Sequence, residues 1–253
     1  MGDRRVTREA LVEALRRAVT PLDWVEAAWL GGSDATGRTD PLSDVDLQLL
    51  VPTARADDAF AAVEAVLADL GGVSARWDVP EPTWHGHRQR FYQLTALPET
   101  AMLDLCVMRR DRLGPFLDPV RHGRPLVWFD RAGALVPTDD PDLEEALRRR
   151  RLQLRDRARV IGHLPGKALA RGHLVEAVDG LHKHLLGPLV ELLRARHAPR
   201  RQDFGLRYLD ADLPPEVVAR LQPLVFVADA EALAAAIAAA RTWLDEELVT
   251  LSV

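Results

Sequence analysis

The chain has little cysteine and no surplus of positive charge. Its single cysteine, Cys106, lies in an apolar run and has no second cysteine to pair with. An internal disulfide and a cysteine zinc site are therefore excluded, and a reducing compartment is favoured. The 33 Lys and Arg residues are outnumbered by 38 Asp and Glu residues, which gives a net charge of −5. Because generic nucleic-acid binders usually carry a basic excess, this balance argues against nucleic acid as a partner.

Long apolar runs are also lacking. No uncharged run reaches the roughly 18–20 residues of a membrane span, and the first 17 residues, MGDRRVTREALVEALRR, have no apolar segment of the signal-peptide type. We therefore expect a cytoplasmic protein with no membrane partner. The 253 residues, 47% of them hydrophobic, can bury a sizeable core in one large domain or two small ones.

The most informative segment is 29–51, WLGGSDATGRTDPLSDVDLQLLV. Asp44 and Asp46 alternate with Val45 and Leu47, and this period of two predicts a strand with both carboxylates on one face. At a rise of roughly 3.3 Å per residue the carboxylates are about 6–7 Å apart, so they can hold one hard cation or two neighbouring ones. The Gly-Gly-Ser turn upstream can offer N–H groups and a hydroxyl to an anion. Together these features predict a site for a metal–nucleoside triphosphate complex.

Periodicity divides the chain into two halves of different character. In the first half, helices are predicted at about 7–19 and 55–70, and strands at 24–30, 43–51, 73–79, 90–97, 101–108 and 125–129. From Asp140-Pro141, a strong helix start, the pattern is helical, at about 141–164, 168–197, 214–221 and 229–248. We therefore predict an α+β protein with a mixed-sheet domain over 1–137 and an all-α helical bundle over 138–253.

Gly32-Ser33, a loop, and Ser43 directly before Asp44-Val45-Asp46 form a pattern that resembles the signature of the DNA polymerase beta-like nucleotidyltransferases. The layout, with an all-α second half, is similar to that of the bacterial antibiotic adenylyltransferases of the aminoglycoside type within this superfamily. The resemblance implies a nucleotidyltransferase fold in the first domain, and a second domain that closes the active-site cleft.

The family uses a third carboxylate on a neighbouring strand, and the resemblance assigns this part to Asp104 in the apolar run AMLDLCVM. A lone charge in such a run is costly to bury without a partner. It therefore marks either a functional site or an aspartate neutralised by a nearby arginine such as Arg109 or Arg110. Glu81 and Glu99 are weaker candidates because their segments are loop-like.

The resemblance implies Mg²⁺-dependent transfer of a nucleotide from ATP or another nucleoside triphosphate. Asp44, Asp46 and Asp104 would be the catalytic and metal-binding residues, with two Mg²⁺ ions stabilising the attacking and leaving oxygens. Asp104 would be a metal ligand, the base that takes the acceptor's proton, or both. The residues assigned to the nucleotide are Gly32, Ser33, Ser43, Lys183, Arg207 and Tyr208. For Ser43 a plain turn role, and for Lys183 and Arg207 a solvated surface role, are alternatives.

The acceptor is less defined than the donor. A hydroxyl-bearing small molecule, such as an aminoglycoside-like antibiotic, fits the two-domain layout, and the acidic balance is compatible with a cationic acceptor. Residues 84–87, WHGH, and the carboxylates of Glu176 and Asp179 are candidates to face it, the latter two with an ordinary polar-surface alternative. Two other functions stay open: a nucleotidyltransferase that modifies a protein partner, as in toxin–antitoxin pairs, and a non-catalytic nucleotide-binding module. The oligomeric state is not predicted.

Overall fold

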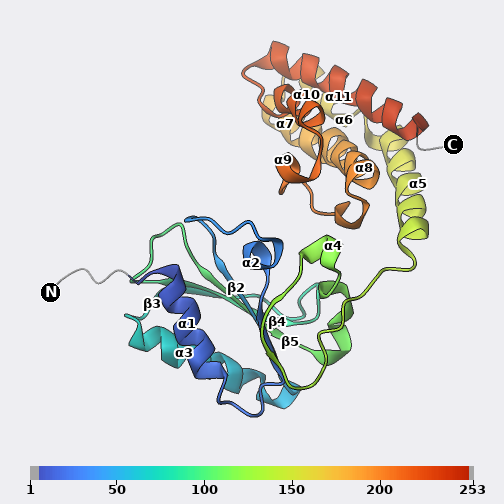
Figure 1. Cartoon of the computed structure of the whole chain (residues 1–253). Coiled ribbons are helices and arrows are strands. Elements are labelled where there is room, and N and C mark those ends of the chain that lie inside the picture. The colour runs from blue at the N-terminus through green and yellow to red at the C-terminus, as the bar shows by residue number, and fades with distance from the viewer. Residues whose placement is uncertain (1–5, 251–253) are drawn as a thin grey trace. The chain divides into compact units, whose positions relative to one another are not determined.

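The structure, a computed structural model, describes residues 6–250. The chain consists of two compact units, Met1–Asp140 and Pro141–Val253 (Figure 1). The first unit contains a mixed sheet with flanking helices and the second is helical, so the predicted α+β fold class is confirmed. None of the helices within 6–250 is both long and apolar enough to cross a membrane.

The first unit is built on a six-stranded sheet with the strand order β3-β4-β5-β2-β1-β6. Its strands are β1 (Ala27–Leu30), β2 (Val45–Leu50), β3 (Val73–Asp78), β4 (Arg88–Leu94), β5 (Leu103–Met108) and β6 (Leu126–Asp130). β2 and β5 run parallel, and the other neighbouring pairs are antiparallel. All six strands lie where the sequence predicts them, with bounds that differ by a few residues. The segment with alternating carboxylates therefore becomes a central strand.

One face of the sheet is covered by α1 (Arg8–Val19) and α3 (Ala56–Asp69) (Figure 1). The Thr7 hydroxyl caps α1 by accepting a hydrogen bond from Ala10 N at 3.2 Å. The core beneath the two helices contains Leu11, Leu15, Phe60, Val63 and Leu67 together with Val45, Leu47, Leu49, Leu103 and Leu105 of the central strands. Each such large side chain contributes roughly 1.5–3 kcal/mol by leaving water.

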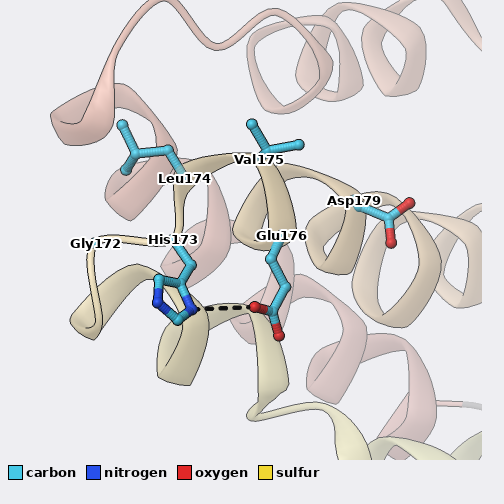
Figure 2. A pocket seen from close by; sticks show the side chains of 6 residues that line it. All are labelled: Gly172, His173, Leu174, Val175, Glu176 and Asp179. Atoms are coloured by element: carbon cyan, nitrogen blue, oxygen red, sulfur yellow. Dashed lines mark hydrogen bonds and ion pairs between the residues drawn. The ribbon is translucent and has the colours of Figure 1, made fainter.

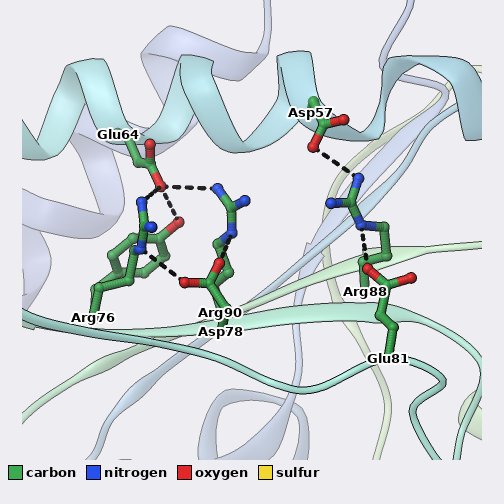
Figure 3. Close-up of polar contacts among 8 residues, drawn as sticks. Asp57, Glu64, Arg76, Asp78, Glu81, Arg88 and Arg90 are labelled. Atoms are coloured by element: carbon green, nitrogen blue, oxygen red, sulfur yellow. Dashed lines mark hydrogen bonds and ion pairs between the residues drawn. The ribbon is translucent and has the colours of Figure 1, made fainter.

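Arginines of strands β3 and β4 are paired with acidic side chains on this same helix-covered side (Figure 3). Glu64 of α3 accepts hydrogen bonds from Tyr92 Oη at 2.8 Å and from Arg90 at 3.0 Å. Arg88 lies between Asp57 and Glu81, with ion-pair distances of 2.9 and 2.8 Å. The positive charge of these arginines is thus neutralised locally by neighbouring carboxylates.

The opposite face of the sheet changes character along the two parallel strands. A small apolar cluster contains Leu50 and Met108 at their carboxyl ends, with Cys106, Leu113 and Leu117. At the amino ends the same face carries Asp46 and Asp104, which are partly buried. Two short helices, α2 (Gly32–Thr36) and α4 (Pro119–His122), belong to this side, and Arg124 N beyond α4 donates to Ala35 O of α2 at 2.9 Å. The candidate functional site therefore lies at the end of this face that carries Asp46 and Asp104.

The second unit consists of helices around one core. They are α5 (Leu143–Ile161), α6 (Leu164–Ala170), α7 (Leu174–Leu181), α8 (Gly187–His197), α9 (Leu209–Asp212), α10 (Pro215–Val225) and α11 (Ala230–Thr250). The single helix predicted at 168–197 is wrong. It is broken at Gly172, whose φ of +76° ends α6, and a π-helical segment, His182–Leu186, separates α7 from α8. The first helix begins at Leu143, slightly after the predicted start at Pro141.

Candidate active site

Asp46 and Asp104 are partners in the parallel register between β2 and β5. Neighbouring strands lie about 4.8 Å apart, and paired residues point to the same face. The sequence places Asp44 and Asp46 on one face, and the structure adds Asp104 to it. Arg109 donates to Asp111 and Arg110 donates to Glu26, so the two arginines offered as alternative partners of Asp104 pair with other carboxylates.

Gly32 lies directly against the carboxylate of Asp46. A Cβ atom at this position would be 1.9 Å from Asp46 Oδ2, and the φ of Gly32 is +51°. Gly31 N also donates to Asp46 O at 2.9 Å. The predicted turn is therefore present, and its backbone packs closely against the Asp46 carboxylate. Residues 32–36 continue from it as the short helix α2. Only glycine fits here without displacing the carboxylate.

Two residues close to Gly32 and Asp46 in the chain carry buried polar atoms. Within the described residues, neither Ser33 Oγ nor Gln48 Oε1 has a hydrogen-bond partner. Gln48 follows Asp46 by two residues and so shares its face, and an added Cβ on Gly31 would lie 2.8 Å from Gln48 Oε1. A buried polar atom without a partner costs about 1–3 kcal/mol. Such atoms beside a carboxylate pair are suited to receive the polar groups of a ligand.

Asp44 and Ser43 join the parts of the site together. Asp44 Oδ1 accepts a hydrogen bond from Met102 N at 2.9 Å, so it links the start of β2 to the start of β5. Ser43 Oγ accepts from Asp40 N at 2.9 Å and donates to Asp40 Oδ1 at 3.1 Å. These contacts give Ser43 the turn role that the sequence left open. Its role toward phosphate stays a prediction.

Arg8 is a residue of this region that the sequence reasoning missed. Its guanidinium donates to Asp44 O at 3.0 Å and to Ser43 O at 3.2 Å, and it forms an ion pair with Asp34 of α2. The Arg8 side chain is 16% exposed. It therefore ties α1 to both sides of the loop between α2 and β2. An arginine at a helix start gives no sequence signal for such a role, because it is usually solvated.

On the other side of Asp104, Gln89 Nε2 donates to Oδ1 of this carboxylate at 2.7 Å. Gln89 Oε1 in turn lies 3.1 Å from His85 Nε2. The sequence singled out His85 as part of a segment facing the acceptor, but it gave no indication of Gln89. Strand β4 contributes this contact because it is the next strand beyond β5.

Two further groups near the site have shifted pKa values. Burial, followed by the charge of Asp104, raises the pKa of the Cys106 thiol far above its usual value. Burial, followed by the charge of His85, lowers the pKa of His87 to about 4. His87 Nδ1 accepts from Arg109 N at 3.0 Å, so the neutral ring carries its proton on Nε2. His87 is thus a neutral core residue at pH 7.

The described residues contain no group of three or more His, Cys, Asp or Glu side chains placed to hold a metal ion. What the structure offers is the neighbouring pair Asp46 and Asp104. Mg²⁺ is usually held by one or two carboxylates together with phosphate oxygens and water, so the pair has the right donor chemistry. The predicted set of three, with Asp44 as a metal ligand, stays a prediction.

The other residues assigned to the nucleotide lie in the second unit. Lys183 is exposed and forms an ion pair with Asp179 at 3.0 Å. Arg207 donates to Tyr208 Oη at 2.9 Å, and Tyr208 is in the left-handed region with a φ of +57°. The buried Arg194 side chain holds this loop by donating to Gly205 O, Arg207 O and Asp212. Roles for Lys183, Arg207 and Tyr208 toward phosphate stay predictions.

An open hollow on the second unit is lined by Gly172, His173, Leu174, Val175, Glu176 and Asp179 (Figure 2). Glu176 lies 3.2 Å from His173 Nδ1, and Asp179 is the partner of Lys183. Both carboxylates that the sequence offered to a cationic acceptor therefore have neighbouring partners. Their surface pairing matches the polar-surface alternative, and a role toward an acceptor stays a prediction.

Solved structures that resemble this chain share little sequence with it. No protein-family model and no curated sequence matches it. In structure it is similar to an aminoglycoside 6-adenyltransferase from Bacillus subtilis, with 12% identity, a TM-score of 0.35, and 96% and 92% of the two chains covered. It is also similar to the spectinomycin adenyltransferase AAD(9) from Enterococcus faecialis, with 8% identity, a TM-score of 0.39, and 96% and 100% covered. At these identities and TM-scores the two similarities carry no conclusion about the activity of this chain.

Proposed function

We propose that the chain is a nucleotidyltransferase that moves a nucleotide, in the first instance adenylyl from ATP, to a hydroxyl of a small molecule and releases pyrophosphate. The observation that carries the proposal is that Asp46 and Asp104 are paired on neighbouring strands and that Gly32 packs directly against the Asp46 carboxylate. Two neighbouring carboxylates beside a glycine turn suit a metal-bound triphosphate, since oxygen ligands and closely approaching backbone are what such a ligand requires.

We assign binding of the nucleoside triphosphate to the residues around Gly32 and Asp46. Asp46 and Asp104, with Asp44, would hold Mg²⁺, and bound Mg²⁺ would neutralise charge on the phosphate oxygens. The buried hydroxyl of Ser33, which has no partner among the described residues, would donate to a phosphate oxygen. Gly32 allows the triphosphate to approach the backbone closely. Lys183, Arg207 and Tyr208 are proposed to supply further contacts from the second unit.

On the acceptor side, Asp104 is proposed as the base. The acceptor oxygen forms a bond to the α-phosphorus while the bond from that phosphorus to the pyrophosphate oxygen breaks. The proton of the hydroxyl passes to the Asp104 carboxylate, and pyrophosphate leaves with the electron pair. The net charge of −5 favours cationic, hydroxyl-rich acceptors such as aminoglycoside-like amines.

The test is an assay of pyrophosphate release. The full chain is incubated with Mg²⁺, each labelled nucleoside triphosphate in turn, and a panel of hydroxyl-rich amines. We expect turnover that is lost in Asp46→Asn and retained in Asp245→Asn, a matched change at an exposed ion pair of α11. Full activity of Asp46→Asn would refute the assignment. Tight Mg·ATP binding without turnover would favour the binding-module alternative, and turnover on a protein alone would favour the protein-acceptor alternative.

A further inference from the structure

Three side chains lead from a loop to the proposed base. His85 lies in the loop before β4, Gln89 on β4, and Asp104 on the adjacent strand β5. His85 Nε2 is 3.1 Å from Gln89 Oε1, and Gln89 Nε2 is 2.7 Å from Asp104 Oδ1. His85 and Gln89 are partly buried, so water competes less with these hydrogen bonds than it would on an open surface.

The direction of each hydrogen bond follows from the backbone. His87 N donates to His85 Nδ1 at 3.1 Å, so in the neutral ring this nitrogen is the acceptor and the proton is on Nε2. The Nε2–H group must then donate to the Gln89 amide oxygen. The Gln89 amide nitrogen is thereby turned toward Asp104, and a flipped amide would place donor against donor and acceptor against acceptor. The orientation of Gln89 is therefore fixed at both ends.

We propose that Gln89, oriented by His85, is a positioning residue for Asp104 in the transfer reaction; this inference rests on the proposed function. An amide N–H donated to a carboxylate favours its ionised form and restricts its rotation. A base must be ionised and correctly aimed before the acceptor hydroxyl arrives, and a metal ligand needs the same properties. Gln89 and His85 touch neither substrate in this proposal and act through Asp104.

The first test compares Gln89→Leu with Gln93→Leu. Both remove an amide from the same face of β4, but Gln93 donates to the carbonyls of Pro98 and Ala101 and not to a carboxylate. For Gln89→Leu we expect kcat to fall about 10- to 100-fold, the usual effect of losing a partner of a functional ligand. The calorimetric Kd for Mg·ATP and the KM for ATP should change by much less than kcat, because Asp44 and Asp46 would still hold Mg²⁺. Gln93→Leu should retain the parent kcat.

The coupling of the two positioning residues is tested in the same assay. His85→Ala should lower kcat in the same direction, and His85→Ala with Gln89→Leu should cost no more than Gln89→Leu alone, because both act through one hydrogen bond. Gln89→Glu, which keeps the shape but replaces the donor with a second carboxylate, should lower kcat further. Parent kcat in Gln89→Leu, or equal losses in Gln93→Leu, would overturn the inference.

A measurement without turnover separates this inference from the proposed function. Nitrogen NMR of the histidine rings, with His85 assigned by its substitution, should show the Nε2–H form. The His85 Nε2 resonance should move in Gln89→Leu. It should also move in Asp104→Asn, because residue 104 contacts Gln89, which in turn contacts His85. An unchanged His85 resonance in Asp104→Asn would refute the proposed coupling of His85 to Asp104 through Gln89, even if pyrophosphate release confirms the activity. Absence of turnover in the parent chain would instead refute the proposed function.

Discussion

Gly32 and Asp46 approach each other so closely that a single added carbon at Gly32 would lie 1.9 Å from Asp46 Oδ2. The two residues come from α2 and β2, on either side of the loop that follows the glycine turn. This approach fixes the carboxylate against backbone and leaves no room for a side chain.

The contact predicts a specific effect of Gly32→Ala. The substitution combines a steric clash with a positive φ, and we expect it to lower the free energy of unfolding by about 2 kcal/mol or more and transfer activity at least tenfold. Gly37→Ala is the matched control, since Gly37 has a φ of +67° but nothing within 4 Å of an added Cβ. It should show the conformational cost, about 1–2 kcal/mol, with activity retained. Urea unfolding and pyrophosphate release measure the two effects, and equal activity losses would contradict the steric account.

The contacts of Arg8 predict that Arg8→Ala loosens the loop at the site. It leaves the carbonyls of Ser43 and Asp44 and the carboxylate of Asp34 without their guanidinium partner, and we expect a loss of about 1–3 kcal/mol in stability. Arg17→Ala, on the same helix but 73% exposed at the arginine, should change stability little. Hydrogen exchange of residues 32–46 should rise in Arg8→Ala alone. Unchanged exchange there would show that Arg8 does not hold the loop.

The lowered pKa of His87, about 4 against an ordinary 6.5, predicts a pH dependence of stability. Between these pH values the unfolded chain binds a proton that the folded chain does not, so the stability contributed by His87 is lost as pH falls from about 6.5 toward 4. His87→Gln should remove this part of the dependence. The free energy of unfolding of both chains, measured by urea between pH 5 and 7, should diverge toward high pH. Parallel curves would contradict the assignment.

In the second unit, the buried Arg194 side chain predicts a large effect of Arg194→Met. Its ion pair with Asp212, at 2.7 Å, has exposed fractions of 0% and 4% for the two side chains. Asp212 keeps its second ion pair, with Arg201 at 2.7 Å, but it loses the Arg194 donor, and the carbonyls of Gly205 and Arg207 lose theirs as well. For these three lost hydrogen bonds we expect a loss of about 3–5 kcal/mol. Arg220→Met, at a half-exposed pair with Glu246, is the control. Thermal unfolding of the full chain measures both, and similar melting temperatures would refute the prediction.

Local patterns predicted the elements that depend on local signals. The alternation around Asp46 predicted a strand with the carboxylates on one face, and the apolar run around Asp104 predicted another strand. The order of the strands depends on pairing between distant segments, so the register that joins these two residues could not be derived from periodicity. Gly172 could not be distinguished from an ordinary helical glycine, because nothing in its local sequence indicates the positive φ that it adopts.

The residues missed at the site share one property. Both have partners that are distant in the sequence: those of Arg8 are 26 to 36 residues away, and that of Gln89 is 15 residues away. The local sequence around an arginine at a helix start or a glutamine in a strand does not indicate such a partner. Asp104 was assigned through the family resemblance, and its charge in an apolar run is a conflict that the local sequence also shows. Residues that support a functional group without standing out from their own neighbours require the tertiary structure to be recognised.

Cys106 provides the chain with a built-in reporter. It is the one thiol in the sequence, it lies two residues beyond Asp104 on the same strand, and it is 7% exposed with a raised pKa. Because burial both shields the thiol and disfavours its thiolate, we expect an alkylating reagent to modify the native chain mainly when β5 opens locally. The rate of modification would measure how often the strand that carries Asp104 separates from its surroundings, and a bound ligand that tightens this region would slow the chemistry without any engineered label.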